Sequence, residues 1–272
     1  MKIELDSLEL HGFHGWLAKH FMDSGWDMKA LCKLIVTSST YRQSTHASAE
    51  LLARDPDNKL LARGPRARLS AEMLRDQALA ASGLLVNKIG GPSVKPYQPD
   101  GLWEEKSSGW KYDTDKGEGL YLRGMYTYWK RASQHPMMMT FDTAARNTCI
   151  VRRQNTSTPL QALVLLNDTQ FVEAARKLAE RMLKEGGATT DARITFAFRL
   201  LTGRHPSKAE LTVLKKLHDE QLALFRADLD DATSLTKVGE STTDTALDHA
   251  ELAACTALAN VLLNFDEAVF KR

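Results

Sequence analysis

The sequence predicts a mainly all-α protein whose helices are interrupted by one long irregular insertion. Hydrophobic residues recur at the three- and four-residue spacing of helices over residues 13–85 and again over 159–272. Between residues 86 and 158 this spacing is lost, and glycine, proline and aromatic residues become frequent. Of the 272 residues, 43% are hydrophobic and 26% are charged, which is typical of a globular protein. We therefore expect a single domain over residues 1–272.

Start and stop signals delimit the first three helices. The apolar stripe from Phe13 to Phe21 ends at Gly25, and Asp27 is a suitable N-cap for the next helix. Ser70 is expected to cap the third helix, although Glu72 lies one residue short of a strict capping box. In the second helix four apolar residues are expected to form a buried stripe: Met28, Leu31, Leu34 and Ile35.

The insertion, residues 86–158, is long for a segment without regular structure. Such a loop in a compact domain is either functional or disordered, and the aromatic content argues against disorder. Residues 121–129 fit either a short β-strand or the first turns of a helix. The aromatic residues of the insertion are Tyr97, Trp103, Trp110, Tyr112, Tyr121, Tyr126, Tyr128 and Trp129.

Helical spacing resumes at Pro159, which suits a first helical position with Thr158 as its cap. The stripe of that helix continues to Gly186. Further amphipathic helices are expected over residues 191–201, 207–225 and 244–265, with a polar linker over 228–243.

Charge and cysteine content exclude several classes of protein. The net charge of +2 gives no argument for a nucleic acid or an anionic membrane. Residues 123–153 are basic and residues 226–272 acidic; we favour their mutual attraction within the fold over a site for an anionic ligand.

Cys32 and Cys255 lie in apolar helical stretches and are expected in the core, and no cysteine spacing is typical of zinc. No segment has the apolar length of a membrane span, and the N-terminus, which lacks a signal peptide, begins as a fragment of a longer protein would.

Several short motifs together resemble one family, over about residues 16–268. The motifs are Trp26-Asp27, Tyr41-Arg42-Gln43-Ser44, Leu61-Ala62-Arg63-Gly64-Pro65-Arg66, Arg68-Leu69-Ser70-Ala71-Glu72, Gly90-Gly91-Pro92-Ser93-Val94, Pro96-Tyr97-Gln98-Pro99, Gly101-Leu102-Trp103, Tyr126-Thr127-Tyr128-Trp129-Lys130-Arg131, Val151-Arg152-Arg153, Thr158-Pro159-Leu160-Gln161 and Leu166-Asn167-Asp168. This set resembles the C-terminal domain of unknown function of planctomycete cytochrome c multidomain proteins. The segment Phe141–Asn147 departs from that pattern because it is less acidic.

The resemblance implies a setting rather than a reaction. It implies an exported parent protein, in the periplasm or at the cell surface, with upstream cytochrome c and companion domains as partners. A c-type haem is expected only in such an upstream domain, and no cofactor is expected in this chain.

The densest polar chemistry lies between residues 135 and 153. In one hypothesis Arg146, Arg152 and Arg153 hold an anionic group, while His135 and Asp142 handle protons. Cys149, beside arginines, would then have a lowered pKa. In the alternative, which we favour, the arginines pair with helix C-termini and with acids of the terminal helices, and Cys149 belongs to the core.

The aromatic residues of the insertion, Tyr97 and Trp103 with Trp110 and Trp129, can stack on sugar rings or anchor the segment; we favour anchoring. His11, His14 and His20 lack a nearby carboxylate or cysteine, so no metal site is expected. Arg63, Arg66, Arg68 and Arg75 lack the interleaved aromatic residues of an RNA reader, so no nucleic-acid partner is expected either.

These patterns favour a non-catalytic interaction or scaffold module with a glycan- or anion-binding face. The partner would be a polysaccharide or another domain of the parent protein. The alternative is an enzyme, a hydrolase or oxidoreductase acting on an anionic polysaccharide together with a separate haem domain. The sequence does not decide whether the chain is an enzyme.

Overall fold

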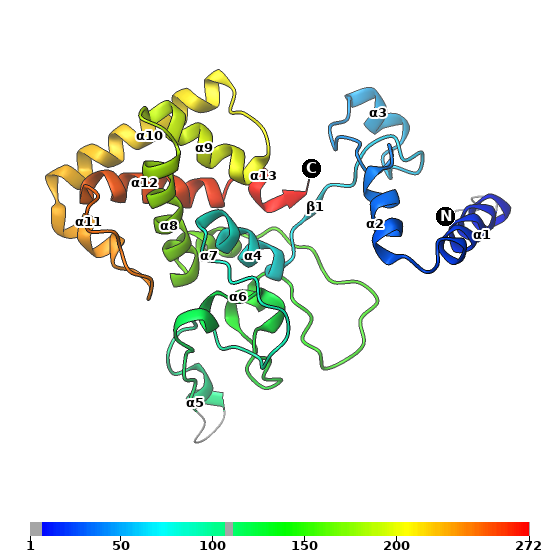
Figure 1. Ribbon diagram of the computed structural model, residues 1–272, viewed down its shortest axis with the longest axis horizontal. Helices are drawn as coiled ribbons and strands as arrows, with labels where there is room; N and C mark the ends of the chain where they lie inside the picture. Colours follow the sequence, from blue (N-terminus) through cyan, green and yellow to red (C-terminus); the bar gives the residue numbers. More distant parts are fainter. Residues whose placement is uncertain (1–6, 107–110, 272) are drawn as a thin grey trace. The chain divides into compact units, whose positions relative to one another are not determined.

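The computed structural model describes residues 7–106 and 111–271, and within them the chain is mainly helical (Figure 1). The predicted all-α class is therefore confirmed. The chain divides into two compact units, Met1–Arg66 and Ala67–Lys271. The expected single domain stays a prediction, and each unit is described by itself. No helix of the described ranges combines the length and the apolar character of a membrane span.

The first unit contains three helices and a tight polar turn. Asp27 caps the second helix as predicted, because its carboxylate accepts hydrogen bonds from the backbone N–H groups of Lys29 and Ala30. The buried carboxylate of Asp55 organises the turn that follows the third helix by accepting from the N–H groups of Lys59 and Leu60, at 2.7 and 2.8 Å. The helices are α1 (Ser7–Asp23), α2 (Met28–Thr37) and α3 (Ala49–Arg54).

The expected buried stripe of α2 is wrong for this unit. Met28 is 59% exposed and Ile35 is 44% exposed, and α2 has no buried residue. Cys32 is likewise exposed, which contradicts its expected place in the core. The helical spacing identified the helix correctly, but a small unit of three helices buries little of its apolar surface.

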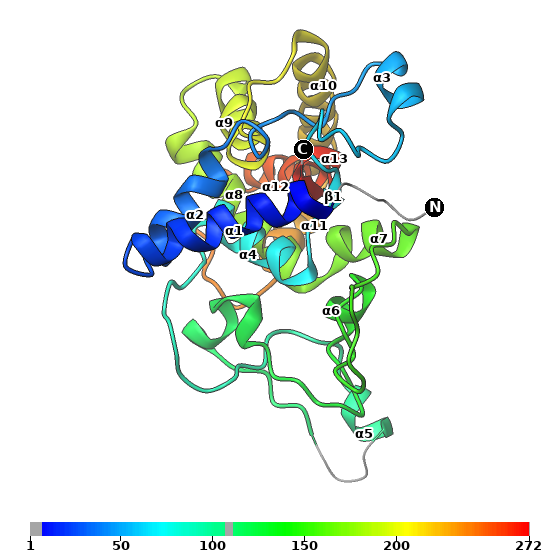
Figure 2. The ribbon, with the colours of Figure 1, turned by 90° about the vertical axis from the view of Figure 1, so that its right-hand side faces the viewer.

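The second unit holds the hydrophobic core, built mainly around α8 and α12. Both views show α8 and α12 beside α9 and α10, while α5 lies at the opposite end of the unit from α10 (Figures 1 and 2). Phe171, Leu178, Phe198 and Leu252 are among its fully buried side chains. The helices are α4 (Ala71–Ser82), α5 (Leu102–Lys106), α6 (Pro136–Thr140), α7 (Pro159–Asn167), α8 (Thr169–Glu185), α9 (Thr190–Thr202), α10 (Lys208–Ala227), α11 (Leu229–Thr236), α12 (His249–Leu263) and α13 (Asp266–Val269).

Local capping explains where these helices begin and where two predictions fail. Thr158 and Gln161 form a full capping box at the start of α7, and Ser70 caps α4 through the N–H of Met73. Asp168 ends α7 and caps α8, which divides the long helix expected from Pro159 to Gly186. The expected linker 228–243 contains α11, because Asp228 caps it through the N–H groups of residues 230 and 231.

The insertion contains little regular structure besides the short helices α5 and α6. Residues 121–129, expected as a strand or a helix start, contain the end of one 3-10 helix, η1 (Gly117–Tyr121), and the whole of another, η2 (Gly124–Tyr126). Isolated bridges join Val86 to Leu122 and Val94 to Thr127. The paired strands, β1 (Ala67–Arg68) and β2 (Phe270–Lys271), lie outside the insertion and run antiparallel.

Candidate functional site

A pocket of about 230 Å³ lies where the chain leaving β1 meets the end of α6 and residues 152–155. It is lined by three of the predicted site residues, Asp142, Arg152 and Arg153, together with Arg68. Ala67, Leu69 and Ser70 also line it. Three guanidinium groups around one small pocket make it suited to a carboxylate, sulfate or phosphate group.

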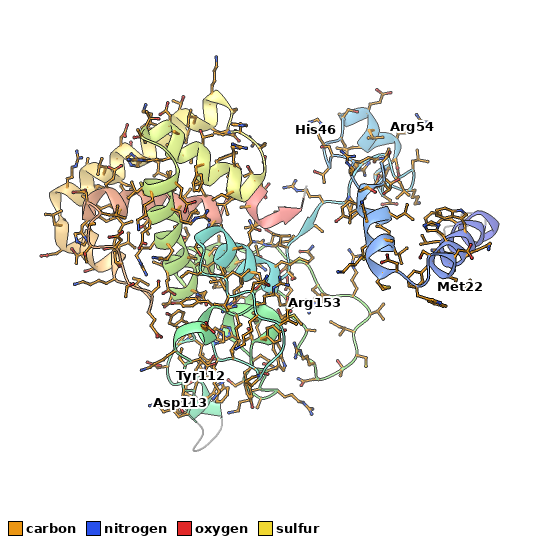
Figure 3. All side chains as sticks on the ribbon, viewed as in Figure 1. Met22, His46, Arg54, Tyr112, Asp113 and Arg153 are labelled. Atoms are coloured by element: carbon orange, nitrogen blue, oxygen red, sulfur yellow. The ribbon has the colours of Figure 1, made fainter. Side chains whose placement is uncertain are left out.

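Arg153, which is labelled in Figure 3, forms a bidentate ion pair with Glu72 in the first turn of α4. The Nη1 and Nη2 atoms of Arg153 lie 2.9 and 3.1 Å from the two carboxylate oxygens of Glu72. Although burial opposes it, this pairing leaves the pKa of Glu72 below its usual value, so Glu72 is ionised at neutral pH. Arg153 therefore has a fixed position and a partly neutralised charge.

Asp142 lies two residues after the end of α6 and has a positive φ of 59°, an uncommon conformation for a residue other than glycine. Its Oδ2 accepts hydrogen bonds from the backbone N–H and the hydroxyl of Thr156, at 2.7 and 2.8 Å. This carboxylate thus anchors residues 152–156 to the end of α6. A backbone held in an uncommon conformation beside a pocket is consistent with a functional role.

Arg68 packs its guanidinium against two aromatic rings. The Cζ atom lies 5.5 Å from the ring centre of Phe141 and 5.4 Å from that of Phe270. Nη1 donates to the hydroxyl of Ser157 at 3.1 Å. Burial lowers the pKa of Arg68, although Asp142 opposes the shift, and the side chain stays charged at neutral pH.

Arg152 differs from the other two arginines. It is exposed, lines the pocket, and makes no hydrogen bond or ion pair with the described part of the chain. A guanidinium with no acidic partner retains its full charge and its hydrogen-bonding capacity for a ligand.

Three other predicted site residues lie away from this pocket. Arg146 stacks on Trp129, with Cζ 4.7 Å from the ring centre. Cys149 is exposed, so its expected place in the core is wrong. His135 is buried, and its Nε2 lies 2.8 Å from the carbonyl oxygen of Tyr97.

The burial of His135 gives the protein a pH dependence that can be tested. Because a carbonyl oxygen only accepts, Nε2 carries the proton, and Nδ1 is buried without a hydrogen-bond partner. Burial lowers the pKa of His135 to about 4 from 6.5, and Arg75 adds to the shift. The unfolded chain therefore takes up this proton first as the pH falls.

Between about pH 6.5 and 4, we expect His135 to account for a loss of about 3 kcal/mol in the stability of the wild type, at ~1.4 kcal/mol per pH unit. His135→Gln should not show this part of the loss. The contribution of His135 is complete above the unfolded pKa and is lost as the pH falls toward the folded value. Urea unfolding at several pH values, with the exposed His205→Gln variant as a control, measures it. A stability difference between the wild type and His135→Gln that does not change with pH would contradict the assignment.

A model of one protein family matches residues 15–218, three quarters of the chain. Its description is "PSD1: Protein of unknown function (DUF1553)". The chain belongs to this DUF1553 family. No curated protein and no solved structure gave a match. All the residues that line the pocket lie within the DUF1553 match, so the pocket belongs to the matched part of the chain.

Several aromatic residues in the insertion of this DUF1553 chain pack closely within the fold. Trp103 is only 4% exposed, and the Nζ of Lys130 lies 4.0 Å from its ring centre. Tyr112 packs edge-on against the same ring at 5.0 Å. The hydroxyl of Tyr97 accepts from the N–H of Glu240 at 2.8 Å. These contacts support the anchoring role and leave little of Trp103 for a sugar; Trp110 lies outside the described residues.

The N-terminal histidines and the acidic C-terminal end also make defined contacts. His20 stacks on Trp16 with ring centres 5.2 Å apart, while the side chain of His11 lies outside the described part. Three acids of the acidic end, Asp244, Glu251 and Glu267, pair with Lys184, Arg193 and Arg204 rather than with the basic segment 123–153. The spacing of apolar residues along one helix could not reveal these partners, because the partners lie in other segments of the chain.

Proposed function

We propose that this chain is a non-catalytic interaction module that binds an anionic group of a polysaccharide in the pocket formed by Arg68, Asp142, Arg152 and Arg153. Arg152 carries the proposal, because it faces the pocket and has no acidic partner among the described residues. Arg153 and Arg68 add charge from fixed positions. The pocket volume of about 230 Å³ suits one carboxylate or sulfate with part of its sugar ring.

The arrangement favours binding over catalysis. Acid–base chemistry needs a proton donor and acceptor within reach of one substrate atom. Asp142 uses Oδ2 to hold Thr156, and His135 is directed to the carbonyl of Tyr97 and is not among the residues that line the pocket. The two groups expected to handle protons thus serve different parts of the fold.

The biological setting is part of the same proposal. The resemblance to planctomycete cytochrome c multidomain proteins supports an exported parent protein at the cell envelope, with a haem domain upstream. In that setting the module would hold the parent protein on an anionic polysaccharide while another domain carries the redox chemistry.

We expect Arg152→Ala to weaken binding to polygalacturonate or dextran sulfate by at least about tenfold, because a charge-assisted hydrogen bond contributes ~1.5–3 kcal/mol. Arg152→Lys should retain part of the affinity, since lysine keeps the charge but loses the planar fork. Calorimetric titration measures both, and comparing the two polymers separates carboxylate from sulfate recognition. Binding should also weaken as salt rises.

Arg131→Ala is the matched control, because Arg131 is an exposed arginine of the same basic segment that does not line the pocket. Neutral dextran is the control for the polymer. Equal affinity of Arg152→Ala and the wild type, or equal binding of neutral dextran, would refute the proposal. Release of new reducing ends from the polyanion would instead favour the enzymatic alternative.

A further inference from the structure

Three side chains with metal-ligand chemistry meet between α10 and α12, away from the pocket. They are His218 of α10 and Glu251 and Cys255 of α12, and one potential ligand atom from each lies within 4.8 Å of the others. Glu251 and Cys255 are four residues apart, so they lie one above the other on the same face of α12. His218 and Cys255 are almost fully buried, at 2% and 1% exposure.

The two ring nitrogens of His218 have different surroundings. Nδ1 lies 3.2 Å from Oδ1 of Asp219. Nε2 lies 3.3 Å from Oε1 of Glu251, yet it is buried and has no hydrogen-bond partner of acceptable geometry. Metal-binding histidines share this arrangement. One ring nitrogen contacts a carboxylate, which orients the ring, and the other nitrogen faces further ligand groups.

The surroundings of the cluster are also suited to a cation. Glu251 is held by Arg193 at 3.1 Å, and because a carboxylate has several lone-pair sites it can keep this contact and still bind a cation. Asp219, which contacts Nδ1 of His218, also lines an open groove along α10.

We propose that His218, Glu251 and Cys255 bind one Zn²⁺-type cation, independently of the anion pocket. A thiolate, an imidazole and a carboxylate form a donor set that favours zinc over magnesium or calcium. Zinc needs its ligand atoms about 2.0–2.3 Å away, so the three side chains need to close by roughly an ångström. A ligand group that carries a proton at the metal-binding atom releases it to water on binding, and the fourth position stays open.

Cobalt is the direct probe, because a Co²⁺–thiolate bond gives a charge-transfer band in the near ultraviolet. The experiment uses the full chain with Cys32→Ser and Cys149→Ser, so that Cys255 is its only thiol. We expect one Co²⁺ per chain, appearance of the band, and loss of the band when Zn²⁺ is added. Cys255→Ser should abolish the band, and His218→Gln should weaken cobalt binding by more than about tenfold.

The controls separate lost ligands from lost folding. His205→Gln changes an exposed histidine and should bind cobalt as the parent does. Circular dichroism shows whether Cys255→Ser and His218→Gln remain folded, and Glu251→Gln supplies a further ligand variant at a less buried position. A folded parent chain that binds no stoichiometric cobalt, or a band that persists in Cys255→Ser, would overturn the proposal. The state of the anion pocket affects neither outcome.

Discussion

Replacing Arg75 with methionine is expected to lower the free energy of unfolding by about 3–5 kcal/mol. Arg75 lies on α4 and is fully buried. Its guanidinium donates to the carbonyl oxygens of Leu122 and Leu120, at 2.5 Å each, and to Oε1 of Gln170 at 3.1 Å. These bonds attach the insertion to α4 and α8.

The substitution of Arg75 has two opposing effects on the free energy of unfolding. Burial lowers the pKa of Arg75 to about 10, so the residue is charged at neutral pH and removing it relieves a desolvation cost. Methionine, however, leaves three buried acceptors without a donor, and each such group costs ~1–3 kcal/mol. The cost of leaving three acceptors unpaired therefore exceeds the desolvation cost that the substitution relieves.

Chemical unfolding measures the total change, and hydrogen exchange locates it. We expect faster exchange in residues 117–128, whereas amides of α12 should change only as the global stability does. Arg199→Met, at an exposed position of α9, is the matched control and should change stability by less than about 0.5 kcal/mol. A change below about 1 kcal/mol in Arg75→Met would mean that the insertion does not depend on this side chain.

Local signals predicted much of the helical framework. Asp27, Ser70 and Thr158 cap helices where the sequence placed them, because an N-cap needs only a polar side chain and the next few backbone N–H groups. Asp168 and Asp228 are the same kind of signal. Because these two caps were not identified, α7 and α8 were predicted as one helix and α11 as part of a linker.

The candidate site was predictable only in part. Asp142, Arg152 and Arg153 are close in the sequence and meet at the pocket, but Arg68 and Glu72 reach it through tertiary packing. In the sequence, Arg68 belongs only to a group of arginines for which no nucleic-acid partner is expected. A short list of residues within one segment cannot show which of them turn inward, as His135 does.

Buried charge was the feature least accessible to sequence reasoning. The spacing of α8 identifies Phe171, Leu178 and Met182 as core residues, and they are buried. The same spacing places Glu173 and Arg176 on a polar face that should contact water. They are fully buried because residues of the segment before α12 pack over that face, which helix periodicity cannot indicate.

Arg176→Met is expected to destabilise the chain by about 3–5 kcal/mol, since it removes one partner from a buried ionic network. Nη1 of Arg176 lies 2.9 Å from Oε1 of Glu180, and Nη2 donates to the carbonyl oxygen of Ser241 at 2.7 Å. Glu173 accepts from the hydroxyl of Tyr121 at 2.9 Å and from the N–H of Ser241 at 2.7 Å. The network therefore joins α8 both to the insertion and to the segment before α12.

A double-mutant cycle distinguishes a charge network from simple packing. If Arg176 acts by compensating buried carboxylates, Glu180→Gln should cost less in the Arg176→Met background than in the wild type, with a coupling energy of about 0.5–3 kcal/mol. Arg199→Met, at an exposed position of α9, is again the matched control and should change stability by less than about 0.5 kcal/mol. Additive effects of the Arg176 and Glu180 substitutions would show that packing alone explains the loss. A positive coupling would establish that α8 needs the charge of Arg176, and not only its volume, to hold the segment around Ser241 in place.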